Sequence, residues 1–206
     1  MMIDLVFPAV GVSVPADHSY PLYAALSRIV PQFHQHQSSI RFAPLTGLAT
    51  DSGRLRLTPR SHLRVRASAE DIRTVLGLAG QSLNIAGSVV RLGAPRLCKL
   101  EPAPRVVSHL VTYKHAQSVD DFLTTTRARL AELGISGQPV VPTIRTGPRA
   151  GEPRRRVLRI RGAKIVGYAL VVAGLTTDDS VRLQELGLGG RQHLGCGFFL
   201  PQEEPQ

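Results

Sequence analysis

Tryptophan is absent from this sequence of 206 residues, and cysteine and methionine occur only twice each. The two cysteines, Cys98 and Cys196, lack the spacing of a metal site, and a single distant pair is weak evidence for a disulfide. No stretch approaches the roughly 18 apolar residues that a membrane-spanning helix needs. The first residues also lack the charged and apolar regions of a secretory signal peptide. We therefore expect a soluble, cytoplasmic protein with no metal, no cofactor and no membrane partner.

Lysine is scarce as well. Lys99, Lys114 and Lys164 are the only lysines among 25 basic residues, the other 22 being arginines, and with 15 acidic residues the formal net charge is +10. The planar guanidinium group suits bidentate phosphate contacts and stacking on bases. A GC-rich genome would explain the choice of arginine over lysine, but it would not explain the net charge. The charge therefore predicts a nucleic-acid partner.

The first half of the chain has the pattern of a ferredoxin-like unit. Apolar residues make up 43% of the sequence, and its length permits one large domain or two of about 100 residues. We expect one helix with Ser19 as its N-cap and Pro31 at its end, and a second helix from Ser68. The expected strands are residues 2–10, residues 54–57 and 62–66 joined by a turn, and a pair or bent strand over residues 82–92. The order is β-α-β-β-α-β.

The second half repeats this order after residues 101–105, where two prolines indicate a linker. We expect strands over residues 106–113 and 196–200, a hairpin over residues 157–175, and helices from Ser118 and Thr176 with aspartates in their first turns. The predicted fold class is α+β, with two tandem ferredoxin-like (RRM-like) domains. Their predicted bounds are residues 1–100 and 105–206.

A strongly basic segment lies within the second half. Residues 145–164 carry eight basic residues and one glutamate. Residues 142–156 are rich in proline, glycine and arginine, and we expect them to form a mobile loop. In a strand, alternate side chains share a face, which predicts a row of guanidinium groups 6–7 Å apart, close to the phosphate spacing of a single strand. An edge strand protected by charges would also be basic, but it would normally mix the two signs. The predicted phosphate-binding residues here are Arg154, Arg155, Arg156, Arg159 and Arg161.

A glycine-rich motif stands close to the end of the sequence. Residues 187–197 contain five glycines, arranged as two Gly-apolar-Gly triplets around five mostly polar residues. The motif precedes a predicted strand and has Gln192 where a dinucleotide-binding loop needs its third glycine, which argues against a nucleotide cofactor. A tight turn between helix and strand is the alternative interpretation. Glycine lets a backbone approach a phosphate closely, so the motif predicts a loop that binds a polyanion, through Gly187, Gly189, Arg191, Gln192, His193, Gly195 and Gly197.

This motif resembles the C-terminal signature of the CRISPR-associated RAMP proteins, Gly-h-Gly-x5-Gly-h-Gly with h apolar, at every defined position. The opening residues 14–34 are similar to the first strand and helix of the repeat-processing endoribonucleases of that superfamily. The segment from residue 151 to the glycine motif is similar to the second half of short members from type I systems. The resemblance implies two ferredoxin-like domains and a basic face that holds CRISPR repeat RNA.

The resemblance also implies the chemistry and its residues. Metal-free RNA cleavage needs a base for the 2′-hydroxyl, an acid for the leaving 5′-oxygen and positive charge near the phosphate. Members of the family cut in this way, leaving a 2′,3′-cyclic phosphate and a 5′-hydroxyl, and their usual histidine lies just after the first helix. His34 matches that place best, His36 competes with it, and Tyr23 matches a helix tyrosine that assists in some members. No lysine follows His34 within a dozen residues, where some relatives use one.

The leading hypothesis is therefore a metal-independent endoribonuclease that cleaves precursor CRISPR RNA and stays bound to the mature crRNA, with other subunits of a type I interference complex as further partners. Two alternatives remain open. One is a RAMP subunit that binds guide RNA without cutting it, and the other is a generic RNA-binding module. His193 is predicted to bind RNA, with a part in the chemistry as an alternative role.

Overall fold

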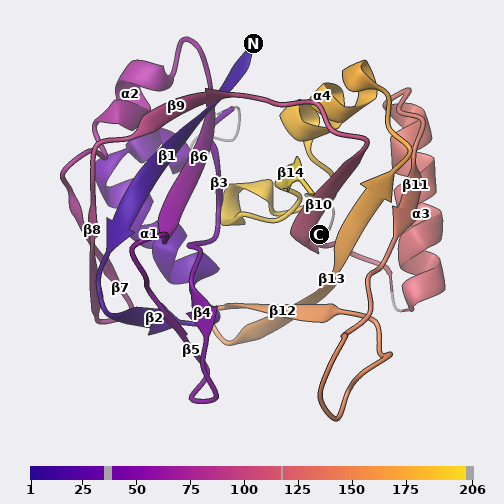
Figure 1. Cartoon of the computed structure of the whole chain (residues 1–206), viewed down its shortest axis with the longest axis horizontal. Coiled ribbons are helices and arrows are strands. Elements are labelled where there is room, and N and C mark those ends of the chain that lie inside the picture. Colours follow the sequence, from indigo (N-terminus) through magenta and orange to yellow (C-terminus); the bar gives the residue numbers. More distant parts are fainter. Residues whose placement is uncertain (35–38, 117, 203–206) are drawn as a thin grey trace. The chain divides into compact units, whose positions relative to one another are not determined.

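The computed structural model describes residues 1–34, 39–116 and 118–202 (Figure 1). The chain forms two compact units, Met1–Lys99 with His193–Gly195 and Leu100–Gln192 with Cys196–Gln206. The short stretch His193–Gly195 thus belongs to the first unit, although it lies near the end of the sequence.

The first unit is built on an antiparallel sheet with the strand order β3-β6-β1-β8-β7, in which β9 also pairs with β1. In the sequence β9, β1, β6 and β3 are the fourth, first, third and second strands of a ferredoxin-like unit, which gives the 4-1-3-2 order of that fold. The strands of this unit are β1 (Met2–Val10), β2 (Ser13–Pro15), β3 (Arg41–Ala43), β4 (Leu48–Ala49), β5 (Arg54–Arg56), β6 (His62–Ser68), β7 (Ser82–Ile85), β8 (Ser88–Leu92) and β9 (Arg96–Lys99). The helices are α1 (Ser19–Ile29), the 3-10 turn η1 (Pro31–His34) and α2 (Ile72–Leu76).

The prediction for residues 54–57 was wrong in its pairing. They form β5, which pairs with β2 and β4 in a separate three-stranded sheet, whereas β6 pairs with β1 and with β3, a three-residue strand that the sequence pattern missed. The Arg54 side chain explains part of this placement. Its Nε donates to Ser13 Oγ at 2.8 Å and its Nη2 to Ser88 Oγ at 2.8 Å, so β5 is held beside β2 and the tip of the β7–β8 hairpin.

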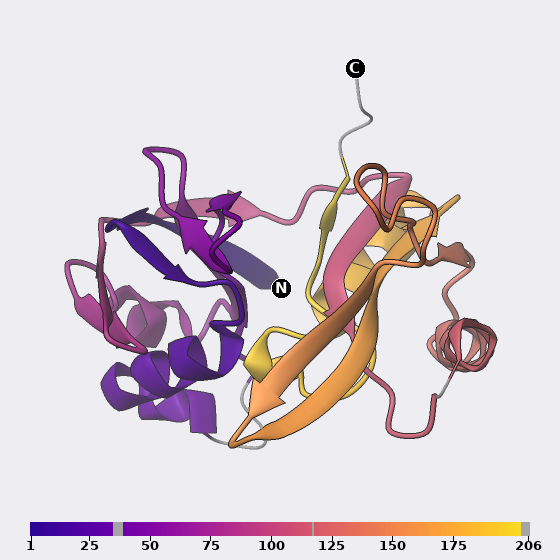
Figure 2. The same ribbon diagram turned by 90° about the horizontal axis from the view of Figure 1, so that it is seen from below.

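The two helices were also predicted imperfectly. The N-cap of α1 is His18 and not Ser19, and α2 is shorter than expected, since it begins at Ile72 and ends at Leu76. Both helices lie on the same side of the sheet (Figures 1 and 2). Their buried residues join those of the strands in one core, which includes Leu5, Phe7, Leu22, Leu26, Phe42, Leu63, Val65 and Val75.

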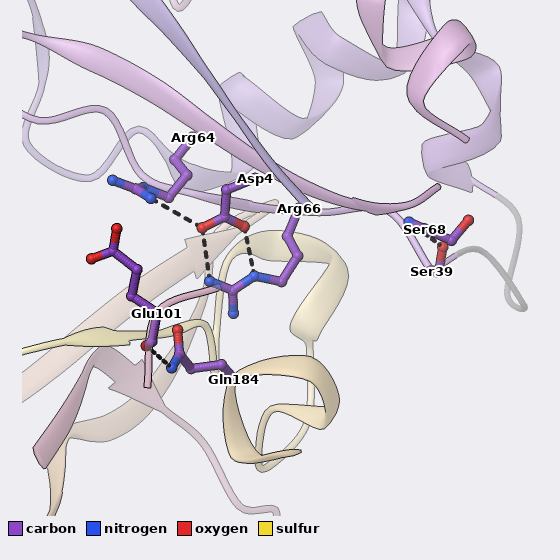
Figure 3. A network of polar contacts seen from close by, with 7 residues as sticks. All are labelled: Asp4, Ser39, Arg64, Arg66, Ser68, Glu101 and Gln184. Carbon is purple, nitrogen blue, oxygen red and sulfur yellow. Dashed lines mark hydrogen bonds and ion pairs between the residues drawn. The ribbon is translucent and has the colours of Figure 1, made fainter. Parts of the chain in front are cut away.

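On the face of the sheet that is opposite to the helices, the first unit carries a row of charged side chains. Asp4 and Arg66 are directly opposite each other on β1 and β6, and they are only 2% and 1% exposed. Arg66 Nε donates to Asp4 Oδ1 at 2.7 Å, its Nη2 donates to Oδ2 at 3.0 Å, and Arg64 Nη1 reaches the same Oδ2 at 3.0 Å (Figure 3). Burial, and next the neighbouring Arg66 charge, lower the pKa of Arg41 on β3. Close to this row Ser68 N–H donates to Ser39 Oγ at 3.4 Å.

The second unit has the strand order β11-β13-β10-β14, again 4-1-3-2 when read from β14, and β12 pairs with the first part of β13. Its core includes Val106, Phe122, Leu130, Leu170, Val172, Leu183 and Phe199. The strands are β10 (Arg105–Val111), β11 (Gln138–Val140), β12 (Arg155–Ile160), β13 (Ala163–Ala173) and β14 (Phe199–Pro201). The helices are α3 (Val119–Glu132), α4 (Thr177–Leu186) and the 3-10 turn η2 (Gln192–Leu194), whose last two residues fall in the first unit.

Helix starts in this unit follow the sequence signals. Ser118 forms a capping box with Asp121, and the Thr176 side chain accepts a hydrogen bond from Asp179 N–H at the start of α4. The proline-rich segment before β10 is fixed to the same helix. Gln184 Nε2 donates to the Glu101 carbonyl at 2.8 Å (Figure 3), and Ala103 N–H donates to Ser180 Oγ at 2.9 Å. The last strand starts at Phe199, later than the expected residue 196.

Candidate active site

A hydrogen-bonded pair of side chains lies where the first helix ends. Tyr23, half-buried on α1, has its hydroxyl 2.8 Å from Nδ1 of His34, and the two rings meet edge to face with centroids 5.1 Å apart. His34 is exposed at the end of η1, whereas Phe33 beside it is only 2% exposed and fixes the turn in the core. The turn itself begins at Pro31, since proline cannot continue α1. The pair thus combines a fixed backbone with an accessible imidazole.

The hydrogen bond allows two arrangements of protons on His34. When Nδ1 carries the hydrogen, it donates to the Tyr23 oxygen, so Nε2 has a lone pair and can accept a proton. When Tyr23 O–H donates to Nδ1, the hydrogen of the neutral ring is on Nε2. The first arrangement makes His34 a base that Tyr23 orients, and it leaves the phenol hydrogen available to a third group.

A second imidazole lies against Tyr23. The rings of Tyr23 and His193 meet edge to face, with centroids 5.4 Å apart and an interplanar angle of 64°. His193 is exposed and lies on η2, in the part of the glycine motif that belongs to the first unit. Sequence reasoning placed His34 and Tyr23 together through the family resemblance, but it assigned His193 to RNA binding. The sequence signal that could have drawn attention to His193 was its position between the two glycine triplets.

Among the other histidines that the structure describes, none joins this group. His36 lies outside the described residues. His18 is only 3% exposed, with Nδ1 2.9 Å from the Pro15 carbonyl and Nε2 accepting from Leu45 N–H at 2.9 Å, so it has a structural role. His62 Nδ1 is 3.2 Å from Thr46 Oγ1, and His109 and His115 are exposed on the second unit.

The glycine motif has a backbone that other residues would adopt only with strain. Gly187, Gly189, Gly195 and Gly197 have φ values of +65°, +78°, +83° and +66°, all in the region that favours glycine. A Cβ at Gly197 would lie 2.0 Å from the Leu188 carbonyl oxygen, and one at Gly189 would lie 2.7 Å from that of Thr112. The glycines therefore allow other parts of the protein backbone to approach closely. Their direct contact with RNA stays a prediction.

Other residues of the motif are more accessible. Gly187, Gly195 and Gly197 are buried, whereas Arg191 and Gln192 are half-buried. Arg191 has a φ of +58° without being glycine. Burial raises the pKa of the Cys196 thiol to about 12. The thiol thus stays protonated and fills an apolar position instead of acting as a nucleophile.

The basic segment forms a hairpin-like loop that leads into β12. Ile144 N–H donates to the Glu152 carbonyl and Gly151 N–H to that of Ile144, both at 2.9 Å, and Arg149 Nε pairs with Glu152 at 2.6 Å. These contacts organise the loop in the structure, and its expected mobility stays a prediction. Figure 2 shows the β12–β13 hairpin that follows as a long twisted ribbon.

The arginines of this hairpin do not form the regular row that was predicted. Arg155, Val157 and Arg159 are exposed on one face, so the two arginines on it are four residues apart, with their Cα atoms about 13 Å apart along the strand. Arg156 lies on the opposite face with the buried Leu158, where burial, and next the neighbouring Arg154, lower its pKa. Arg154 is exposed before the strand, and Arg161 occupies the turn between β12 and β13.

Two like charges nevertheless oppose each other on the exposed face. Arg159 on β12 is directly across from Lys164 on β13, and both side chains are exposed. Like charges at such positions destabilise a sheet. This end of the hairpin therefore presents two basic side chains next to each other on an exposed face.

Within residues 1–34, 39–116 and 118–202 there is no group of three or more His, Cys, Asp or Glu residues that could hold a metal ion. None of the helices in these ranges has the length and apolar character needed to cross a membrane.

Comparison with known proteins identifies the family. The Cas6 family model, described as Cas6 Crispr, matches residues 3–204. The chain belongs to the Cas6 family. It is 41% identical over 201 residues to the CRISPR-associated endonuclease Cas6 of Myxococcus xanthus, which covers 98% of this chain and 82% of that protein.

Solved structures share the fold. A CRISPR-associated protein Cas6 superposes with a TM-score of 0.68 at 13% identity, covering 98% of this chain and 99% of the other. A RAMP protein that binds different RNA substrates superposes with a TM-score of 0.67 at 15% identity, covering 98% and 100%. The family resemblance, the tandem ferredoxin-like fold and the assignment of this Cas6-family chain as a CRISPR-associated endonuclease are thereby confirmed.

Proposed function

We propose that this Cas6-family chain cleaves CRISPR repeat RNA without a metal ion and that His34 is the base. The observation that carries the proposal is the 2.8 Å contact between Tyr23 Oη and His34 Nδ1 in an exposed position directly after the first helix. With Nδ1–H donating to Tyr23, Nε2 of His34 removes the proton of the 2′-hydroxyl. The 2′-oxygen then attacks the neighbouring phosphorus and the bond to the 5′-oxygen breaks.

This reaction consumes no water. The new bond joins the 2′-oxygen to phosphorus, so one product ends in a 2′,3′-cyclic phosphate, and the leaving 5′-oxygen takes a proton to become a 5′-hydroxyl. Tyr23 orients the imidazole through the same hydrogen bond. In the arrangement that makes His34 a base, the phenol hydrogen is directed to a non-bridging phosphate oxygen, where negative charge develops.

The RNA is held by exposed basic groups. Arg154, Arg155 and Arg159 are exposed at the start of and along β12, and Lys164, opposite Arg159 on β13, is exposed as well. Arg156 is half-buried on the opposite face of β12 and is also part of the proposed contact set. Arg161 at the turn and Arg191, Gln192 and His193 of the glycine motif complete the proposed contact set.

The partner is CRISPR repeat RNA before the cut and crRNA after it. We propose that the chain retains the cut RNA and so joins other subunits of a type I interference complex. A basic surface supports retention, because the phosphates that it binds are present both before and after the cut. The fit with other subunits rests on the family resemblance.

The test is cleavage of the cognate repeat RNA in EDTA by the wild-type protein, His34→Ala, His36→Ala and the control variant His115→Ala. We expect a single cut by the wild type and by His115→Ala, and a loss of about 100- to 10,000-fold in His34→Ala, the usual contribution of a proton-transfer group. Loss in His36→Ala with full activity in His34→Ala would move the site to His36. Activity in both single variants would overturn the proposed base.

A further inference from the structure

Tyr23 stands between two imidazoles, and the reaction proposed above uses only one of them. The His34 ring lies 5.1 Å from the Tyr23 ring and the His193 ring 5.4 Å from it, both edge to face. All three residues belong to the first unit of the chain. Two imidazole rings, which can exchange protons near neutral pH, thus lie against a single phenol ring.

The chemistry needs a second proton-transfer group. One group accepts the proton of the 2′-hydroxyl and another supplies a proton to the leaving 5′-oxygen. These two oxygens lie on opposite sides of the phosphorus in an in-line displacement, so base and acid must approach from two directions. Tyr23 is already hydrogen-bonded to His34, and a phenol is intrinsically a weaker acid than an imidazolium.

His193 and His34 are each held in place by a neighbouring residue that packs on the buried Phe42. Phe33, which precedes His34, packs edge to face on Phe42 with centroids 6.1 Å apart, and the two are 2% and 0% exposed. Gly195 lies against this same Phe42. A Cβ there would be 3.1 Å from the Phe42 carbonyl oxygen and 3.4 Å from its ring atom Cε2.

Leu194, between His193 and Gly195, is only 3% exposed. Each histidine is therefore an exposed residue held by buried neighbours that share Phe42. These buried neighbours fix the backbone of His34 and of His193 relative to one another, although the two side chains do not contact each other. This arrangement suits two side chains that must approach one phosphate group from opposite sides.

We infer that His193 is the general acid of the reaction, and this inference rests on the proposed function. Protonated His193 gives its proton to the 5′-oxygen as the P–O5′ bond breaks, while His34 takes the proton of the 2′-hydroxyl. One proton is accepted and one is donated in each cut. Proton exchange with water then restores both imidazoles, and no other reactant is consumed.

The experiment compares two RNA substrates that differ in one atom. The first is the ordinary repeat RNA, and the second has sulfur in place of the 5′-oxygen at the scissile phosphate. A thiolate leaves without protonation because thiols are far more acidic than alcohols, so the sulfur substrate no longer needs the acid. We expect His193→Ala to cut ordinary RNA about 100- to 10,000-fold more slowly than the wild type, and the sulfur RNA within about threefold of the wild type.

His34→Ala should be slow on both substrates because the base is still needed. His193→Gln, which keeps the size and the hydrogen-bonding capacity of the side chain, guards against a change in the loop and should behave as His193→Ala does. His115→Ala, an exposed histidine of the other unit, should match the wild type on both RNAs.

Three outcomes would overturn the inference. An equal loss on both substrates in His193→Ala and His193→Gln would show a role in binding alone. Undiminished cutting of ordinary RNA by both variants would remove His193 from the reaction. If Tyr23→Phe, and not the His193 variants, cut the sulfur RNA at the wild-type rate but ordinary RNA slowly, the tyrosine would be the acid. In each case wild-type cutting that depends on His34 would leave the proposed function standing, whereas its absence would defeat the proposed function itself.

Discussion

His18 shows how one buried side chain can tie stability to pH. Leu45 N–H donates to Nε2, so that nitrogen must be unprotonated, and the ring hydrogen is on Nδ1, where it donates to the Pro15 carbonyl. Burial is the largest cause of the lowered pKa of His18, and the neighbouring carbonyls and Asp17 oppose it. The neutral ring thus links the start of α1 to the chain that follows β3.

We predict that this histidine makes the free energy of unfolding fall in mild acid. Its pKa is lower in the folded protein than in the unfolded chain, so the unfolded chain takes up the proton first. The contribution is complete well above about pH 6.5 and is lost as the pH falls below that value. Denaturant unfolding between pH 8 and 5 should show this slope in the wild type and a smaller slope in His18→Gln.

The matched control for this prediction is His115→Gln, because His115 is exposed on the second unit. It should keep the slope of the wild type. Equal slopes in His18→Gln and in the wild type would contradict the assignment of the pH dependence to His18.

At the scale of single residues, the sequence predicted Tyr23 and His34 together but could not predict what surrounds Asp4. Arg64 and Arg66 alternate along β6 with the buried Leu63 and Val65. Their shared partner is about sixty residues away in the sequence, and only the pairing of β1 with β6 brings it opposite Arg66. The ring contact between Tyr23 and His193 escaped prediction for the same reason.

At the scale of elements, the glycine motif is a close-packed turn. Gly197 has a φ of +66°, donates its N–H to the Leu110 carbonyl at 2.7 Å, and leaves no space for a Cβ beside Leu188. Gly174, which follows β13 in the same unit, has a φ of +71° but meets nothing within 4 Å. A substitution at Gly174 therefore introduces backbone strain alone, whereas one at Gly197 introduces both backbone strain and steric overlap.

We predict that Gly174→Ala costs about 1–2 kcal/mol of stability, the cost of the left-handed backbone alone. Gly197→Ala should cost more than about 3 kcal/mol, because the new methyl group also displaces the Leu188 backbone. Thermal or denaturant unfolding of both variants measures the difference. Equal costs would mean that the turn relaxes freely, and the structural account of the motif would then be wrong.

The elements were predicted best where a local signal exists. The capping box at Ser118, the N-cap Thr176, the first strand and the hairpin of β12 and β13 all follow from neighbouring residues. Three-residue strands such as β3 carry too few residues for a period to be visible. The pairing of β5 with β2 depends on contacts of Arg54 with residues distant in the sequence, so the alternation could not reveal it.

At the scale of the whole molecule, the excess of ten positive charges predicts RNA binding that weakens steeply with salt. Each phosphate contact on single-stranded nucleic acid contributes about 0.7 to the slope of log K against log salt concentration. We predict that replacing Arg155 and Arg159 with glutamine lowers this slope by about 1.4.

The control removes the same charge elsewhere. Arg127 on α3 and Arg182 on α4 are exposed, and their double replacement by glutamine should change the slope much less. Binding of a non-cleavable repeat RNA at several salt concentrations measures both variants. Equal decreases in slope would show that net charge, and not the face of β12, determines RNA binding.

The charge and the 43% apolar content were sufficient to predict a folded nucleic-acid-binding protein. They could not identify the substrate, and the glycine motif did so only through its resemblance to a family. Composition carries no information on which side chains meet. The arrangement of Tyr23, His34 and His193 depends on a fold that joins residues from both ends of the sequence.

The measurement that tests the proposed reaction most directly is the chemical identity of the two new RNA ends made by the wild-type protein in EDTA. We predict one cut in the repeat, with a 2′,3′-cyclic phosphate on the upstream fragment and a 5′-hydroxyl on the downstream fragment. A 3′-hydroxyl with a 5′-phosphate, or cutting that requires a divalent metal, would contradict attack by the 2′-hydroxyl with His34 as its base.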